Sequence, residues 1–135
     1  ARKESGGGVV SRPLRMFAVT WNLAGKLPPA SIGTIAPADD DVDIIAVGTQ
    51  ECLVNCGSVK SFVQAGKAKW ERRVQAVLGP QFTPLDTCGL NAMHLAVYVR
   101  KSLLPLVSHV KVEKVATGFM GLVGNKGGIA IKFHV

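Results

Sequence analysis

Residues 90–117, LNAMHLAVYVRKSLLPLVSHVKVEKVAT, decide the fold class of this chain. Leu90–Arg100 alternates between two sets of side chains, as in a strand whose two faces differ. Lys101–Pro105 then predicts a turn, and Leu106–Thr117 predicts a second strand. A third strand, Gly128–Val135, follows a glycine-rich loop. This succession of strands without an intervening helix predicts a meander and a largely antiparallel sheet.

The upstream sequence adds two strands and one helix. Leu14–Leu23 carries apolar residues on both faces, which predicts a central strand covered on both sides. Asp43–Thr49 predicts a short second strand. Ser58–Leu78 shows apolar residues at helical spacing, with Trp70 among them as a core residue, and Gly79-Pro80 ends the helix. One helix followed by a meander of strands predicts an α+β fold.

The composition is that of a folded domain with a basic surface. The chain has 135 residues, 47% of them hydrophobic and 19% charged, which suits one domain with a sizeable core. Its formal charge of +7 attracts nucleic acid, anionic lipid head groups and inositol phosphates alike, and a basic surface without a partner is the alternative. No apolar run approaches the ~20 residues that span a bilayer. Three cysteines, an odd number, predict reduced thiols in a cytosolic protein.

Two strand ends carry polar side chains that could take part in chemistry. Thr20-Trp21-Asn22 closes the first strand and would present the Asn22 amide at the rim of the sheet; the alternative is an Asx turn that only ends the strand. Glu51 closes the second strand, and a carboxylate there suits Mg²⁺, which proteins hold with one or two carboxylates plus substrate phosphates. The alternative for Glu51 is an exposed residue at a strand end.

The loop Gly118–Gly128, GFMGLVGNKGG, is a candidate phosphate site. Its glycines would bring backbone N–H groups close to an anion, and Lys126 would add a point charge. A nucleotide-binding P-loop needs Gly directly before the Lys, Ser or Thr after it, and a following helix. Here Asn125 precedes the lysine, Gly127 follows it and a strand comes next, which excludes a P-loop NTPase. A hairpin turn with an incidental lysine is the alternative.

Together these segments resemble the inositol polyphosphate 5-phosphatases of the endonuclease/exonuclease/phosphatase superfamily. The resemblance is carried by TWNLAG (20–25), DIIAVGTQE (43–51), HLAVYVRKSLLP (94–105) and VATGFMGLVGNKGGIAIKF (115–133). The first two segments are shared broadly with the nucleases of the superfamily. The GNKGG loop between two strands is the feature that points to inositol phosphatases.

The resemblance implies a fold, a reaction and residue roles. The fold would be part of a four-layer α/β/β/α sandwich with mostly antiparallel sheets. The reaction would be Mg²⁺-dependent removal of the 5-phosphate from phosphoinositide lipids at a membrane surface or from soluble inositol polyphosphates, in a cytoplasmic protein with peripheral membrane contact and no nucleic-acid partner. Asn22 would help to arrange the metal site and the attacking water, Glu51 would ligate Mg²⁺, and Asn125 and Lys126 would bind the substrate phosphate.

The resemblance also implies an incomplete domain. Residues 1–13 are interpreted as a flexible lead-in, and residues 14–135 as the N-terminal part of a catalytic domain truncated at its C-terminus. The family's later motifs, which hold a catalytic His, an Asp-Asn pair and a closing Asp-His pair, have no counterpart in this sequence. We therefore expect these 135 residues alone to be inactive and to self-associate. A superfamily nuclease acting on DNA or RNA, and a catalytically dead phosphatase-like binding module, are the alternatives.

Overall fold

The structure is a computed structural model that describes residues 12–33, 41–52, 59–117 and 127–135, with side chains in the helix described from residue 67 onward. In chain order its elements are β1 (Met16–Asn22), β2 (Ile44–Gln50), α1 (Val59–Leu78), β3 (Phe82–Leu90), β4 (Met93–Arg100), the 3₁₀ helix η2 (Lys101–Leu106), β5 (Ser108–Ala116) and β6 (Gly127–His134). Each strand and the helix expected from the sequence are present.

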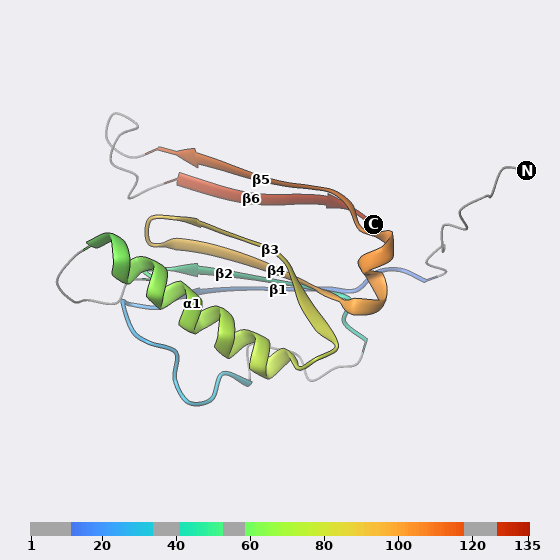
Figure 1. Cartoon of the computed structure of the whole chain (residues 1–135), viewed down its shortest axis with the longest axis horizontal. Helices are drawn as coiled ribbons and strands as arrows, with labels where there is room; N and C mark the ends of the chain where they lie inside the picture. Colours follow the sequence, from blue (N-terminus) through green and yellow to red (C-terminus); the bar gives the residue numbers. More distant parts are fainter. Residues whose placement is uncertain (1–11, 34–40, 53–58, 118–126) are drawn as a thin grey trace, which may run out of the picture.

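The described elements stack as three layers (Figure 1). Helix α1 covers one face of a four-stranded sheet with the strand order β1-β2-β4-β3, and the two-stranded sheet β5-β6 lies over the opposite face. The pair β1-β2 is parallel, whereas β2-β4, β3-β4 and β5-β6 are antiparallel. This confirms the predicted α+β fold with mostly antiparallel sheets. A fourth, helical layer is not among the described residues.

Strand β1 differs from its predicted central position. It lies at the edge of the four-stranded sheet as described, and β2 occupies the interior. Phe17, Val19 and Trp21 pack against the core under α1, but the alternate residues are exposed, and Met16 retains 60% of its accessible surface. The prediction failed because apolar residues are common on protein surfaces, so apolar side chains on both faces do not by themselves place a strand inside a sheet.

The main core lies between α1 and the sheet. Trp70, Val74 and Leu78 follow one another at four-residue spacing, which places them on one face of the helix, and they pack against β2 and β4. Trp70 is 4% exposed and contacts Trp21 edge-on, with ring centroids 5.2 Å apart, which confirms its predicted place in the core. Gly79 ends the helix in the left-handed conformation at φ 76°. In the described part of the chain, no helix is long and apolar enough to cross a membrane.

A buried carboxylate fixes the start of the parallel pair. The Asp43 side chain is 1% exposed and accepts hydrogen bonds from Arg12 Nη1 at 2.7 Å, Arg12 Nη2 at 2.6 Å and the Arg15 backbone N–H at 2.9 Å. The Arg12 guanidinium holds the pKa of Asp43 below its usual range, against the opposing effect of burial. Arg12 is thus anchored to β2, while residues 1–11 of the expected lead-in lie outside the described residues.

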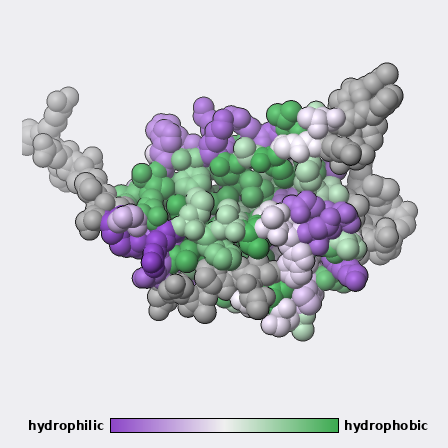
Figure 2. Space-filling view, turned by 180° about the vertical axis from the view of Figure 1, so that it is seen from behind, coloured by the Kyte–Doolittle hydropathy of each residue, from purple (hydrophilic) through white to green (hydrophobic). Residues whose placement is uncertain are grey.

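The remaining strands form two hairpins. Asn91, at φ 48°, begins the two-residue turn between β3 and β4, which is why β4 begins at Met93 rather than at the predicted Leu90. Between the sheets, Phe133 of β6 packs with Ile131 against a smaller core around Val99. Seen from behind the view of Figure 1, hydrophobic surface extends across the middle of the molecule (Figure 2). We expect this surface to favour association with a further apolar surface.

Candidate active site

The candidate site lies where the parallel strands β1 and β2 end. Their register pairs Asn22 with Gln50, so the last residue of β1 lies beside the last residue of β2. Glu51 follows directly, and Asn22 Nδ2 donates a hydrogen bond to Glu51 Oε1 at 2.8 Å. The structure therefore brings together the two residues, 29 positions apart in the sequence, that were expected at the metal site.

The chain after β1 fixes the orientation of the Asn22 amide. Asn22 Oδ1 accepts a hydrogen bond from the Ala24 backbone N–H at 2.9 Å, which forms an Asx turn, and Ala24 has the positive φ of 48°. The backbone N–H of Leu23 donates to Gln50 O at 2.8 Å, and that of Gly25 donates to Glu51 O at 3.0 Å. The Asx turn considered as an alternative is thus present, and it points the amide NH₂ toward Glu51.

Glu51 is held in an unusual backbone conformation. Its φ of 52° lies in the left-handed region, which costs a residue with a β-carbon about 1–2 kcal/mol. The hydrogen bond to its carbonyl fixes one side, and on the other the backbone N–H of Cys52 donates to Ala92 O at 2.9 Å. Cys52 is itself 2% exposed. A strained backbone that persists under such constraints is common at functional sites, where it aims a side chain.

The donor set fits a hard cation held partly by substrate. Both side chains are exposed, and Glu51 Oε2 has no hydrogen-bond partner among the described residues. No group of three His, Cys, Asp or Glu side chains that could hold a metal occurs in the described ranges. A single carboxylate is what Mg²⁺ needs when water and substrate phosphates complete its shell. The Asn22 amide oxygen accepts from Ala24 and the amide NH₂ donates to Glu51. Asn22 is therefore placed to orient the Glu51 carboxylate.

A second polar pair near the site was not assigned a role from the sequence. Gln50 Nε2 donates to Thr20 Oγ1 at 2.7 Å across the parallel pair. Thr20 and Asn22 lie two residues apart on β1 and therefore share one face of the strand. The sequence signal for this pair is the presence of two polar residues, Thr20 and Asn22, at alternate positions near the end of β1.

The expected phosphate-binding residues, Asn125 and Lys126, lie outside the described residues. The strands on either side are described: Ala116 of β5 pairs with Gly127 of β6. Gly127 must be glycine here, because a β-carbon would lie 2.2 Å from Val115 O. Figure 1 shows these strand ends at the same end of the molecule as the carboxyl ends of β1 and β2.

Curated relatives are similar over most of the chain. The Homo sapiens phosphatidylinositol polyphosphate 5-phosphatase type IV is 28% identical over 126 residues, which cover 90% of this chain and 18% of that protein. The Mus musculus type II inositol 1,4,5-trisphosphate 5-phosphatase is 29% identical over 129 residues, which cover 90% of this chain and 12% of that protein. The chain thus spans less than one fifth of the length of these relatives.

Two solved structures share the fold. The inositol polyphosphate 5-phosphatase domain of SPsynaptojanin, in complex with inositol (1,4)-bisphosphate and a calcium ion, has a TM-score of 0.72 and 27% identity, with 89% of this chain and 36% of that chain covered. A Cimex nitrophorin in its ferrous NO complex has a TM-score of 0.69 and 22% identity, with 90% and 42% covered, which shows the fold alone.

The family assignment rests on a match across most of the sequence. Residues 19–135 match the Endonuclease/Exonuclease/phosphatase family 2, a range that contains Asn22, Glu51 and the glycine-rich loop. The layered sheets agree with the fold of the synaptojanin domain. This chain belongs to the Endonuclease/Exonuclease/phosphatase family 2.

Proposed function

We propose that the protein containing this chain is a Mg²⁺-dependent phosphatase that removes the 5-phosphate from phosphoinositides or soluble inositol polyphosphates. The observation that carries the proposal is the 2.8 Å hydrogen bond between Asn22 and Glu51 at the carboxyl ends of β1 and β2. Support comes from relatives that are named as 5-phosphatases. Because the chain spans only a small part of them, the activity is proposed for the whole protein.

Each residue has a defined role in this proposal. Glu51 would bind the cation through its carboxylate, and Asn22 would keep that carboxylate turned toward the substrate by donating to Oε1. When bound, Mg²⁺ would neutralise charge on the phosphoryl oxygens. Asn125 and Lys126, which lie between β5 and β6 in the sequence, would bind the phosphate. The choice of a divalent cation is supported by the calcium ion and inositol (1,4)-bisphosphate bound to the synaptojanin domain.

The reaction on lipid substrates would take place at a membrane surface. Removal of a phosphate from a lipid head group requires contact with a membrane surface, so we propose a cytoplasmic protein that can approach membranes peripherally. The formal charge of +7 would favour such contact with anionic lipids. We expect these 135 residues alone to be inactive, because they span less than one fifth of the length of the relatives named as 5-phosphatases.

A nuclease is the competing function, because the same net charge would also attract a phosphodiester backbone. The nitrophorin fold match is a reason to test chemistry directly, since one fold can serve unrelated functions. Assays should therefore compare inositol 1,4,5-trisphosphate, phosphatidylinositol 4,5-bisphosphate in vesicles, single-stranded DNA and RNA. Release of phosphate from the inositol substrates, with intact nucleic acid, is the expected result.

The decisive variant is Glu51→Gln in the full-length protein. It keeps the side-chain size but removes the charge that binds Mg²⁺, and we expect kcat/KM to fall at least about 100-fold. Glu113→Gln is the matched control, because Glu113 is an exposed glutamate on β5 whose carboxylate pairs with Lys132 at 3.0 Å. Mg²⁺-dependent turnover by Glu51→Gln within a few-fold of the wild type would refute the assignment.

A further inference from the structure

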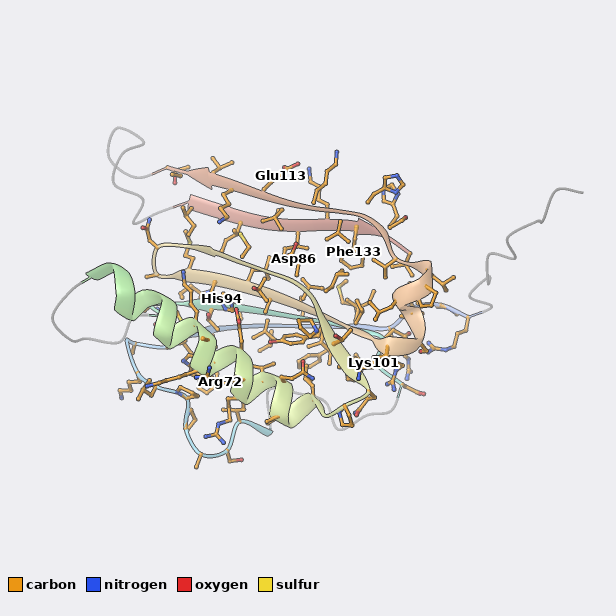
Figure 3. The ribbon with its side chains drawn as sticks, viewed as in Figure 1. Arg72, Asp86, His94, Lys101, Glu113 and Phe133 are labelled. Atoms are coloured by element: carbon orange, nitrogen blue, oxygen red, sulfur yellow. The ribbon has the colours of Figure 1, made fainter. Side chains whose placement is uncertain are left out.

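A polar pocket of about 340 Å³ lies between α1 and the end of β3, and its lining contains neither Asn22 nor Glu51. Its chemistry comes from Lys67 and Glu71 of α1, Gly89 of β3, His94 of β4 and Lys114 of β5. We call it the Lys67 pocket. Figure 3 shows His94 pointing into the space between α1 and the sheet. These residues form no motif in the sequence, because four separate elements contribute them.

The pocket lies at the same end of the four-stranded sheet as the candidate active site, but it contains neither Asn22 nor Glu51. His94 pairs in register with Thr49, one residue before the end of β2. The Trp21 ring packs in the core under α1, so the next residue, Asn22, faces the other side of the sheet. His94 is on the α1 side, where Glu71 contacts it. Lys67, Glu71 and His94 therefore lie on the α1 side of the sheet, whereas Lys114 comes from β5, which lies over the opposite face.

The two lysines share the pocket with one carboxylate, that of Glu71, whose negative charge raises the pKa of Lys67. In the part of the chain that the structure describes, neither Lys67 nor Lys114 forms a salt bridge. Burial lowers the pKa of Lys67, and the positive charge of Lys114 lowers it as well. Two ammonium groups that repel each other across a pocket would both be stabilised by an anion between them.

Gly89 makes room for the Lys67 ammonium group, and His94 forms a hydrogen bond with the Glu71 carboxylate. A β-carbon at Gly89 would lie 2.3 Å from Lys67 Nζ, so only glycine lets the ammonium group occupy this position. His94 is 5% exposed, and burial lowers its pKa, which favours a neutral ring that donates from Nε2 to Glu71 Oε1 at 2.7 Å. The carboxylate of the pocket is therefore already engaged by a hydrogen bond.

We propose that the Lys67 pocket binds a phosphate group between Lys67 and Lys114, as a second anion site distinct from the Asn22–Glu51 pair. A phosphate group presents several acceptor oxygens, so both ammonium groups can donate to it at once. The volume is near the lower end of the range for ligand pockets, about 300–1,000 Å³, which suits a phosphate group with a small carrier. The group can belong to free phosphate or to a phosphorylated lipid head group.

The test compares the thermal stability of the protein in inorganic phosphate and in chloride at matched ionic strength, with EDTA present. Phosphate is expected to raise the Tm of the wild type, because a ligand that binds only the folded state stabilises it. Lys67→Gln and Lys114→Gln should each weaken the apparent phosphate affinity about tenfold or more. Lys69→Gln is the matched control, since Lys69 is an exposed lysine of the same helix that does not line this pocket.

Equal phosphate effects in all four proteins would overturn the proposal, and so would an equal loss in Lys69→Gln, which would indicate a general charge effect. Lys114→Gln carries the test if Lys67→Gln does not fold, because Lys114 is exposed. Sedimentation with phosphatidylcholine vesicles, with and without phosphatidylinositol 4-phosphate, then identifies the source. If the wild type and Lys69→Gln bind the phosphatidylinositol 4-phosphate vesicles but Lys67→Gln and Lys114→Gln do not, the ligand is a lipid head group. If phosphate raises the Tm but the protein does not bind the vesicles, the ligand is free phosphate. A Glu51→Gln protein should keep the phosphate effect, so this test is independent of the proposed phosphatase activity.

Discussion

Replacement of Asn22 with Ala removes two hydrogen bonds that have different consequences. The bond to Glu51 Oε1, at 2.8 Å, joins an amide to a carboxylate at an exposed site, so its loss should cost about 1–1.5 kcal/mol of transition-state stabilisation. That corresponds to roughly a tenfold fall in kcat/KM. The bond from the Ala24 N–H, at 2.9 Å, only shapes the backbone, and its loss should lower folding stability by about 0.5–1 kcal/mol.

A double-mutant cycle tests whether Asn22 acts through Glu51. If its only role in turnover is to orient that carboxylate, Asn22→Ala should have little further effect in a Glu51→Gln background. The Glu51→Gln change alone should cost at least about 2.7 kcal/mol, equivalent to 100-fold. The double variant should therefore be about as active as Glu51→Gln, which leaves a coupling energy of about 1–1.5 kcal/mol between the two positions.

The assay is phosphate release from inositol 1,4,5-trisphosphate by the full-length protein over a range of Mg²⁺ concentrations. Asn22→Asp adds a sharper readout, because it keeps an acceptor for Ala24 but places a second carboxylate against Glu51. Its activity should fall most at low Mg²⁺ and recover partly at high Mg²⁺, since a bound cation offsets the repulsion. Thr20→Val is the control, as it removes only the bond from Gln50. Additive losses in the cycle would refute the orienting role of Asn22.

Three further predictions concern the loop, the buried ion pair and the core. Lys126→Ala should lower kcat/KM by the equivalent of roughly 2–4 kcal/mol on a soluble inositol phosphate, and an unchanged value would make it an ordinary surface lysine. Asp43→Asn should lower the free energy of unfolding by about 1.5–3 kcal/mol at pH 7. The pKa of Asp43 is lower in the folded state than in the unfolded state, so the stability that this carboxylate contributes is present above the unfolded pKa near ~3.9 and is lost as pH falls through the folded pKa. In urea titrations, the stability of the Asp43→Asn variant should therefore depend less on acid pH than that of the wild type. Trp70→Ala should cost about 3–5 kcal/mol in the same titrations, and a loss below about 1 kcal/mol would contradict its place in the core.

The sequence predicted those parts of the fold that depend on local periodicity. Trp70 recurs with other apolar residues at helical spacing, and it lies in the core as expected. The position of β1 was not predictable in the same way, because apolar residues on both faces say nothing about how many neighbours a strand has. The exposure of Met16 and the edge position of β1 follow from pairing between distant segments, which no local pattern encodes.

The two residues of the candidate site could be predicted from the sequence, but their contact with each other could not. Asn22 and Glu51 were each visible as polar side chains at strand ends, and each had a plain structural alternative. Their contact depends on parallel pairing of β1 with β2, whose register places Asn22 beside Gln50. The left-handed backbone of Glu51 was not predictable, since glutamate has no preference for that conformation. The Lys67 pocket could not be predicted from the sequence, because its two lysines come from α1 and β5, which are far apart along the chain.

The strand directions explain why one edge of the sheet carries two kinds of site. Parallel strands bring two carboxyl ends together, so Asn22 and Glu51 meet although a long crossover separates them. At the same edge the antiparallel pair β3-β4 brings the end of one strand to the start of the next, so Gly89 lies opposite His94. A carboxylate suited to a cation and a lysine pocket suited to an anion thus lie at the same end of the sheet. The two sites have no lining residue in common, so substitutions in one should change binding at the other by no more than about 0.5 kcal/mol.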